Sequence, residues 1–343
     1  MPDLTLDDIA KLAGVSRSTV SRVVNEHPNV RASVRSRVLR VIESTGYQPN
    51  AAARTLASQR SRMLGLVLPR SVSSFFSDPY FPRLTQGVAQ ACNQYDYTLG
   101  LFLISTKEDE EKIYPRISRK GLLDGLLVQA GKIGDHLIDQ LMDSNVPFVI
   151  AGRPSQTHDV SYIDVDNVEA AQNAVSHLVR LGCQRIGMIS GMPLSTVSVD
   201  RKEGYCRALT ERGRDLEANL IAEGDYTEAG GYYAMQKLLS AKPDAVFASS
   251  DLMAIGAMRA VREAGLRIPE DIALVGFDDL SMAASTNPPL TTIRQPISQF
   301  GFSAVEILID LIENGIKPAR RVIMATELVI RDSCGAKQKI VIE

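Results

Sequence analysis

From residue 63 onward, short apolar runs alternate with longer stretches in which apolar residues recur at helical spacing. The apolar runs are residues 63–68, 97–104, 125–128, 148–150, 185–189, 245–248 and 273–276, and the helical stretches are residues 81–95, 108–119, 134–144, 167–181, 200–212, 228–240 and 251–264. Strands that alternate with helices predict parallel sheets covered by helices. The region is too long for one open sheet of ordinary size, so we expect an α/β fold with two lobes.

The first 62 residues show a different pattern, with three short stretches of helical periodicity. Thr5 and Asp8 have the spacing of a capping box and predict the start of the first helix. Ser16 is suited to cap a second helix over residues 17–25, and a third helix is expected over residues 32–45.

The second of these helices separates apolar from polar side chains. Val20, Val23 and Val24 share one face by helical spacing. The other face carries Arg17, Ser18, Ser21, Arg22 and Asn25. Three short helices around one small core, with a polar and basic second helix, predict a helix-turn-helix.

Charge is distributed unevenly between this head and the rest of the chain. Residues 1–62 hold ten Lys or Arg and five Asp or Glu, a net charge of +5, whereas the whole chain has a net charge of −2. A basic head on an acidic body indicates a module that binds phosphate groups. The alternative is a three-helix bundle whose basic face is simply solvated.

The head resembles that of a known family. The ungapped runs Thr5-Leu6-Asp7-Asp8-Ile9-Ala10, Ala13-Gly14-Val15-Ser16, Thr19-Val20-Ser21-Arg22-Val23-Val24-Asn25 and Gly46-Tyr47-Gln48-Pro49-Asn50-Ala51-Ala52-Ala53-Arg54-Thr55-Leu56 resemble the lactose/galactose repressor (LacI/GalR) family of transcriptional regulators. The resemblance implies that the second helix enters the major groove, where Arg17, Ser18 and Arg22 read bases. Arginine suits this role because it binds guanine in a bidentate manner. The residues expected at the DNA are Thr5, Ser16, Arg17, Ser18, Ser21, Arg22, Asn25, Asn50, Ala53 and Leu56.

Residues 48–61 are expected to form a hinge between head and body. Pro49 disfavours helix before it, and Asn50 is a good N-cap for a short helix that places Ala53 and Leu56 on one face. A helix this short is marginal alone in water. The resemblance implies that two such helices pair in the minor groove and insert Leu56 between base steps. An ordinary linker is the alternative.

The body resembles the same family. Its landmarks are Val165-Asp166-Asn167, Arg201 with Gly204-Tyr205, Ser250-Asp251, Gly276-Phe277-Asp278-Asp279 and the run from Pro289 to Pro296. The resemblance implies a periplasmic-binding-protein-like body of two Rossmann-like lobes, three crossovers and a ligand cleft. The expected domains are a head over 1–47, a hinge over 48–61 and a body over 62–343, with lobe 1 at about 62–165 and 296–322 and lobe 2 at about 166–293 and 323–343.

Ligands of open α/β lobes lie beyond the C-terminal ends of strands. Asp278, Ser250 and Arg153 each follow a predicted strand. The resemblance implies that Arg201, Tyr226 and Asp278 contact the effector, together with Tyr80 and Phe81 from the first lobe. Ser250 stands where some family members have an amide. The expected effector-binding set is therefore Tyr80, Phe81, Arg153, Arg201, Tyr226, Ser250 and Asp278.

Some of these residues also have a structural interpretation. Arg201 is compatible with a surface ion pair, Tyr226 with a core aromatic, and Asp278 with a turn cap, while the role of Arg153 stays open. A carboxylate, an arginine and several aromatic rings together suit a polyol, because they provide charged hydrogen bonds and stacking surfaces. A purine is compatible with the same set, so a sugar is favoured and a purine co-repressor is the alternative. Gly152-Arg153-Pro154 resembles regulators of oligosaccharide or glucoside genes.

Other classes of protein find little support. The sequence contains no phosphate loop, His-Glu-x-x-His or Gly-x-Ser-x-Gly motif, so we expect no enzyme, cofactor or metal. A solute-binding receptor requires a signal peptide, which the N-terminus lacks, and no stretch is apolar enough to span a membrane. The four separated cysteines are expected to be reduced in a bacterial cytoplasm.

These observations predict a sequence-specific transcriptional regulator, with repression as the expected mode. We expect it to bind a pseudo-palindromic operator and to respond to a small molecule, a mono- or oligosaccharide being favoured. The C-terminus is too short for even two heptads of a coiled coil, so a homodimer is expected.

Overall fold

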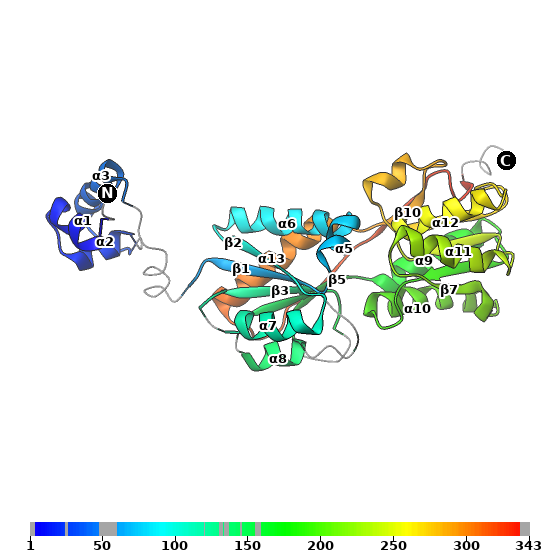
Figure 1. Cartoon of the computed structure of the whole chain (residues 1–343), viewed down its shortest axis with the longest axis horizontal. Coiled ribbons are helices and arrows are strands. Elements are labelled where there is room, and N and C mark those ends of the chain that lie inside the picture. Colours follow the sequence, from blue (N-terminus) through cyan, green and yellow to red (C-terminus); the bar gives the residue numbers. More distant parts are fainter. Residues whose placement is uncertain are drawn as a thin grey trace. The chain divides into compact units, whose positions relative to one another are not determined.

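The computed structural model describes residues 4–24, 27–47, 60–119, 121–129, 133, 137–144, 146–154 and 159–336. The chain divides into two compact units, one of Met1–Arg62 with Lys120–Asp124 and one of Met63–Arg119 with Gly125–Glu343 (Figure 1). The first unit contains the head and the second contains the body. In the described part of the chain, no helix is both long and apolar enough to cross a membrane.

The head consists of α1 (Leu6–Ala13), α2 (Arg17–Val24) and α3 (Ala32–Thr45). The predicted capping box is present, since the Asp8 N–H donates to Thr5 Oγ1 at 3.3 Å and the Thr5 N–H donates to Asp8 Oδ2 at 2.9 Å. Gly14 has a φ of 62° and so makes the left-handed turn that ends α1. The core of the head is built around Ile9, Val20, Val23 and Val38, which are buried.

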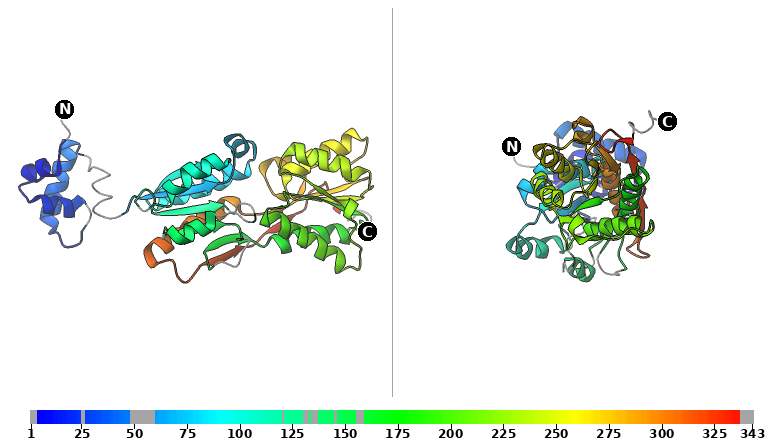
Figure 2. Two further views of the ribbon diagram at one scale, coloured as in Figure 1. Left: turned by 60° about the horizontal axis from the view of Figure 1, so that its bottom comes forward. Right: turned by 90° about the vertical axis from the view of Figure 1, so that its right-hand side faces the viewer.

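Lobe 1 is a parallel sheet with the strand order β11-β5-β4-β3-β1-β2. Its strands are β1 (Met63–Leu68), β2 (Thr98–Leu103), β3 (Gly125–Gln129), β4 (Phe148–Ala151), β5 (Tyr162–Val165) and β11 (Arg321–Met324). Its helices are α5 (Val72–Ser77), α6 (Tyr80–Gln94), α7 (Lys107–Ile117), α8 (Leu137–Ser144) and α13 (Ile297–Asn314). The sheet lies between these helices (Figure 2).

Lobe 2 has the strand order β12-β10-β9-β8-β6-β7 and is parallel except for the antiparallel pair β10–β12. Its strands are β6 (Ile186–Ser190), β7 (Ile221–Glu223), β8 (Ala245–Ala248), β9 (Ala273–Asp278), β10 (Thr291–Arg294) and β12 (Glu327–Val329). Its helices are α9 (Asn167–Arg180), α10 (Thr196–Thr210), α11 (Glu228–Leu239) and α12 (Asp251–Glu263), with 3-10 turns at Ala218–Leu220 and Ser281–Ser285.

The chain passes between the two sheets three times, after β5, after β10 and after β11. Each lobe is therefore assembled from separate stretches of sequence. A three-helix head followed by two α/β lobes confirms the predicted fold class.

Several elements differ from those that the sequence pattern predicts. Helices α5 and α13 are not among the predicted helices, and five short strands are not among the predicted strands. These strands are β5, β7, β10, β11 and β12. In addition, α10 begins at Thr196 rather than at residue 200, which places Arg201 in its second turn.

Candidate functional site

Helix α2 presents the polar face that is predicted to contact DNA. Val20 and Val23 are buried in the core of the head, while Arg17, Ser18 and Arg22 are exposed. Arg17 Nε lies 3.9 Å from Asp7 Oδ2, and exposed pairs at such distances contribute little stability. The side chains of Arg17 and Arg22 are therefore accessible to a partner.

Two other residues expected at the DNA act as helix caps. Ser16 Oγ accepts a hydrogen bond from the Thr19 N–H at 3.2 Å at the start of α2, and Thr5 caps α1. Ser21 is half-buried in α2. The remaining expected contacts lie outside the described residues and stay predictions: Asn25, Asn50, Ala53 and Leu56.

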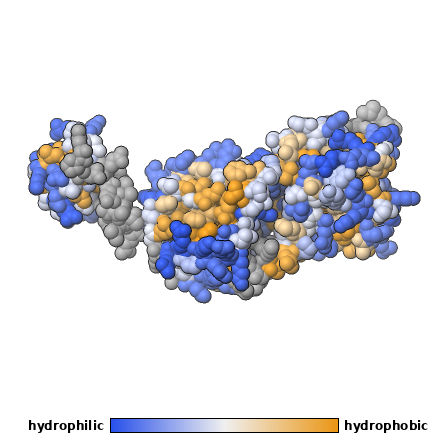
Figure 3. All heavy atoms as spheres, in the orientation of Figure 1, coloured by the Kyte–Doolittle hydropathy of each residue, from blue (hydrophilic) through white to orange (hydrophobic). Residues whose placement is uncertain are grey.

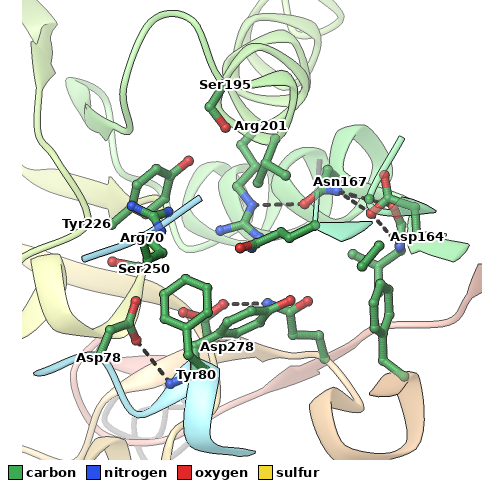
Figure 4. A pocket seen from close by; sticks show the side chains of 18 residues that line it. Arg70, Asp78, Tyr80, Asp164, Asn167, Ser195, Arg201, Tyr226, Ser250 and Asp278 are labelled. Carbon is green, nitrogen blue, oxygen red and sulfur yellow. Dashed lines mark hydrogen bonds between the residues drawn. The ribbon is translucent and has the colours of Figure 1, made fainter. Parts of the chain in front are cut away.

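The body contains a pocket whose lining comes from both lobes (Figure 4). Its space is about 740 Å³ when the open solvent at its mouth is included. Six of the seven residues expected to bind an effector line it: Tyr80, Phe81, Arg201, Tyr226, Ser250 and Asp278. The fold thus brings together side chains that the sequence singles out at widely separated positions.

Arg201 is buried in the wall that lobe 2 contributes to the pocket, with 4% of its surface exposed. Its guanidinium donates from Nε to Asn167 Oδ1 at 2.9 Å and from Nη1 to the Ser249 carbonyl at 2.5 Å. The guanidinium carbon also lies 3.5 Å from the centroid of the Phe277 ring. These contacts fix the orientation of the side chain.

Asp278 ends β9 and is also buried. Its Oδ1 accepts a hydrogen bond from Gln295 Nε2 at 2.5 Å. Burial raises the pKa of Asp278 to about 7, and the charge of Asp78 adds to this rise, while Arg201 and the hydrogen bond from Gln295 oppose it. The protonated form of Asp278 is therefore favoured more than in an exposed aspartate.

A second buried carboxyl group, Asp164, follows the same pattern at the end of β5. Its Oδ1 accepts hydrogen bonds from the Val165 N–H at 2.8 Å and from Asn167 Nδ2 at 3.2 Å. Burial raises the pKa of Asp164 to about 6, while the Val165 N–H works in the opposite direction. Asn167 thus links Asp164 to Arg201 (Figure 4).

Lobe 1 contributes two aromatic rings, one arginine and one aspartate to the pocket. Tyr80 and Phe81 begin α6 and pack edge to face, with ring centroids 5.3 Å apart. The Arg70 guanidinium carbon lies 5.0 Å from the centroid of the Phe81 ring. Burial raises the pKa of Asp78, which the Tyr80 N–H and Arg70 counteract. Neither Arg70 nor Asp78 is among the pocket residues expected from the sequence.

Two polar atoms of the lobe 1 wall are buried without a hydrogen-bond partner anywhere in the described part of the chain. They are Arg70 Nε and Gln129 Oε1. Buried polar atoms in native proteins nearly always have a partner, in protein or in bound water. A polar ligand or ordered water in the pocket would supply the missing bonds.

The local backbone conformation positions Tyr226 and Ser250. Tyr226 has a φ of 68°, which L-residues seldom adopt, and its ring fills the space beside Gly191. A Cβ atom on Gly191 would lie 2.1 Å from Tyr226 Cζ, so a larger residue there would displace the tyrosine ring. Ser250 is the N-cap of α12, where its Oγ accepts a hydrogen bond from the Met253 N–H at 3.3 Å.

Arg153, the seventh expected residue, is not among the residues that line the pocket. It pairs instead with Asp200, donating from Nε at 3.2 Å and from Nη2 at 2.5 Å. Its neighbour Gly152 does line the pocket.

The described residues hold no group of three or more His, Cys, Asp or Glu side chains that is arranged to bind a metal ion. All four cysteines carry free thiols: Cys92, Cys183, Cys206 and Cys334. The residues that line the pocket offer hydrogen-bonding groups, buried charges and aromatic rings.

Comparison with known proteins agrees with this arrangement. Residues 5–50 match the family model described as bacterial regulatory proteins, lacI family, and residues 175–334 match a periplasmic binding protein-like domain. The chain is 35% identical to the HTH-type transcriptional regulator CelR of Thermobifida fusca, over 96% of this chain and 98% of that protein. It is 34% identical to the HTH-type transcriptional repressor PurR of Aliivibrio salmonicida, again over 96% and 98%.

Solved structures show the same likeness. A CelR–cellobiose complex superposes with a TM-score of 0.77 at 33% identity and covers 96% of this chain and 99% of that one. The lac repressor dimer bound to operator and the anti-inducer ONPF superposes with a TM-score of 0.83 at 28% identity, with the same coverage.

A helix-turn-helix head joined to a two-lobed body with a polar pocket defines a DNA-binding transcriptional regulator with a ligand-binding domain. The chain belongs to the lacI family of bacterial regulatory proteins. The relatives are transcriptional regulators, which confirms the prediction of a regulator rather than an enzyme.

Proposed function

We propose that this protein is a repressor that binds a pseudo-palindromic operator as a homodimer and that responds to a neutral sugar in the body pocket. The observation that carries the sugar assignment is the composition of the pocket. Three carboxyl groups, those of Asp78, Asp164 and Asp278, face two guanidinium groups and several aromatic rings.

The excess of carboxyl groups favours a ligand that donates hydrogen bonds and disfavours an anion. Sugar hydroxyls donate to carboxylates and accept from arginine, and the apolar face of a sugar stacks on aromatic rings. The partnerless Arg70 Nε and Gln129 Oε1 offer one further donor and one further acceptor. The CelR structure, which is similar to this chain, was solved with cellobiose.

A purine is the second candidate, because PurR is similarly close to this chain in sequence. Thermal-shift assays with cellobiose, other neutral disaccharides, glucose, hypoxanthine and guanine separate the two. A ligand at 100 times its Kd stabilises the folded protein by about 2.7 kcal/mol, which is readily measured. A shift with purines alone would contradict the sugar assignment.

Support for a dimer comes from the edge of lobe 1. Strand β2, at the edge of the sheet, reads Thr-Leu-Gly-Leu-Phe-Leu, and none of its residues is buried. Leu101 is 41% exposed. Figure 3 shows apolar side chains gathered on this lobe. An apolar edge strand left uncovered is a site for association, and the similar lac repressor structure is a dimer on operator DNA.

The dimer model predicts how DNA binding depends on the number of half-sites and on salt. Fluorescence anisotropy with a full inverted repeat should show much tighter binding than with one half-site of equal length. The logarithm of the affinity should fall linearly with the logarithm of salt concentration, by about 0.9 for each phosphate neutralised. Equal affinity for the half-site would refute dimeric binding, and a flat salt response would refute phosphate contacts by the basic head.

A further inference from the structure

Two adjacent aspartates at the end of β9 have different surroundings. Asp278 lines the effector pocket, whereas Asp279 lines a separate surface groove with Pro82, Arg83 and Arg331. Both have positive φ, 116° for Asp278 and 55° for Asp279. Consecutive non-glycine residues in this region are strained, so surrounding contacts must hold the backbone in place.

The side chain of Asp279 supplies such contacts by binding two arginines. Its Oδ2 accepts from Arg294 Nε at 2.7 Å, and its Oδ1 accepts from Arg331 Nη2 at 2.6 Å. Only 10% of the Asp279 side chain is exposed, and only 17% of that of Arg331. Burial alone would raise the pKa of Asp279, yet the two arginines hold it below its ordinary value. The carboxylate is therefore charged and paired on both oxygens.

One of the two arginines stands at a connection between the lobes, and the other lies within lobe 2. Arg294 is the last residue of β10, directly before the chain crosses to α13 in lobe 1. Arg331 follows β12 and also donates to the Leu290 carbonyl oxygen, just before β10. Asp279 is thus tied to one of the three connections between the lobes and to the segment that follows β12.

A third contact reaches lobe 1 itself. Arg83 Nη1, on α6, donates to the carbonyl oxygen of Asp279 at 3.1 Å. Tyr80 and Phe81 in the first turn of the same helix line the effector pocket. We call Asp279 with Arg83, Arg294 and Arg331 the connection cluster.

We propose that Asp279 is a positioning residue that couples the effector contact Asp278 to the angle between the lobes. A ligand that forms a hydrogen bond with the Asp278 carboxyl group acts on a strained backbone. The next residue, Asp279, is bound to Arg294 at one connection, to Arg331 in lobe 2 and to Arg83 on α6 in lobe 1. A change at Asp278 therefore reaches the β10–α13 connection and lobe 1 through one peptide unit. The inference rests on the proposed effector function of the pocket, and it adds the route by which occupancy is transmitted.

Asp279→Asn tests this proposal, because the amide keeps the shape but cannot pair with two guanidinium groups as a carboxylate does. Asp271→Asn is the matched control, since Asp271 pairs with Arg267 within lobe 2 alone. In full-length protein without ligand, hydrogen exchange at residues 294–296 and 325–331 should rise by about tenfold or more in Asp279→Asn. Exchange in β1 and β8 should remain at the wild-type rate, which distinguishes loosened connections from general destabilisation.

The second readout is the response of DNA binding to cellobiose, with a duplex recovered by selection from random DNA. The coupling is the ratio of the DNA affinities measured without and with saturating cellobiose. In the wild type this ratio is expected to be ~5–150-fold, and in Asp279→Asn it should fall close to one. The cellobiose affinity should stay within about threefold of wild type, since Asp279 does not line the pocket. Wild-type coupling or unchanged exchange in the variant would overturn the proposal.

Two further outcomes are separable. If Asp279→Asn does not fold, Arg83→Gln replaces it, because this change removes the hydrogen bond from α6 to Asp279 and leaves both Asp279 ion pairs intact. Arg83→Gln should also lower the coupling. Unchanged coupling in this variant would overturn the proposal. If wild-type protein does not bind cellobiose, the sugar assignment loses its support, and the exchange measurement alone decides on the role of Asp279.

Discussion

Replacing Asp278 with asparagine is expected to lower the affinity for the sugar effector by about 100-fold, because hydrogen bonds to a charged group contribute ~1.5–3 kcal/mol each. Asparagine preserves the side-chain shape and an oxygen that can accept from Gln295 Nε2. The variant should therefore fold, and its response to effector should be lost. Isothermal titration calorimetry with the sugar that stabilises the wild type measures the effect.

The same variant tests the charge state of the pocket. The pKa of Asp278 is about 7 in the folded protein against an ordinary value of 3.8, so between these values the folded state keeps a proton that the unfolded state releases. The Asp278 contribution to stability is therefore present below about pH 4 and is lost as pH rises to about 7. The neutral amide of Asp278→Asn does not titrate and adds no such pH dependence.

The melting temperature of the unliganded variant should accordingly fall less than that of the wild type between pH 5 and pH 8. Asp164, Asp78 and Asp251 also have pKa values raised by burial, so a pH dependence from these groups remains in both proteins. If the melting temperature falls with pH equally in the two proteins, Asp278 is already ionised in the folded wild type. If effector affinity is unchanged in Asp278→Asn, Asp278 is not part of the binding site.

Gly87→Ala is expected to destabilise lobe 1 severely. An added Cβ at residue 87 on α6 would lie 1.8 Å from the carbonyl oxygen of Ser298 on α13, and one at Gly301 on α13 would lie 2.5 Å from that of Leu84. The two helix backbones touch at these glycines, so the clash meets backbone rather than a flexible side chain. Overpacking of this kind costs ~1–3 kcal/mol and occasionally more.

Gln90→Ala is the matched control, because it introduces the same residue at an exposed position of the same helix. Surface substitutions of this kind change stability by about 0.5 kcal/mol or less. Urea denaturation of both variants gives the comparison. A Gly87→Ala protein as stable as Gln90→Ala would mean that α6 and α13 do not pack as closely as described.

The sequence predicts the helices of the head more completely than the elements of the body. The head is determined by local signals, such as the Thr5–Asp8 capping box and the valines spaced along α2. Helix α13 carries a similar signal that is sufficient to predict it, because its buried residues recur at helical spacing: Ile297, Phe300, Gly301, Ala304, Val305, Leu308, Ile309 and Leu311. The edge strands β7, β11 and β12 are three or four residues long and depend on partners distant in sequence.

The residues of the pocket also differ in how far the sequence predicts them. Asp278 follows from the rule that ligands lie beyond strand ends, and Arg201 and Tyr226 follow from the family resemblance. The strand-end rule also holds for two pocket residues that are absent from the expected set, Arg70, which follows β1, and Gln129, which ends β3. Arg153 follows β4, but its side chain pairs with Asp200. A position after a strand does not determine the direction in which a side chain points, so the sequence could not predict this pairing.

The central claim is that the exposed face of α2 reads DNA sequence in a dimer, and selection of binding sites from random DNA tests it most directly. Full-length protein should enrich one inverted repeat, and Arg17→Ala should relax the preference at one base pair in each half-site, at a cost of ~1–3 kcal/mol. Arg60→Ala, a change beside the body, should weaken binding to all sequences alike. No enriched repeat, or an unchanged preference in Arg17→Ala, would contradict the account.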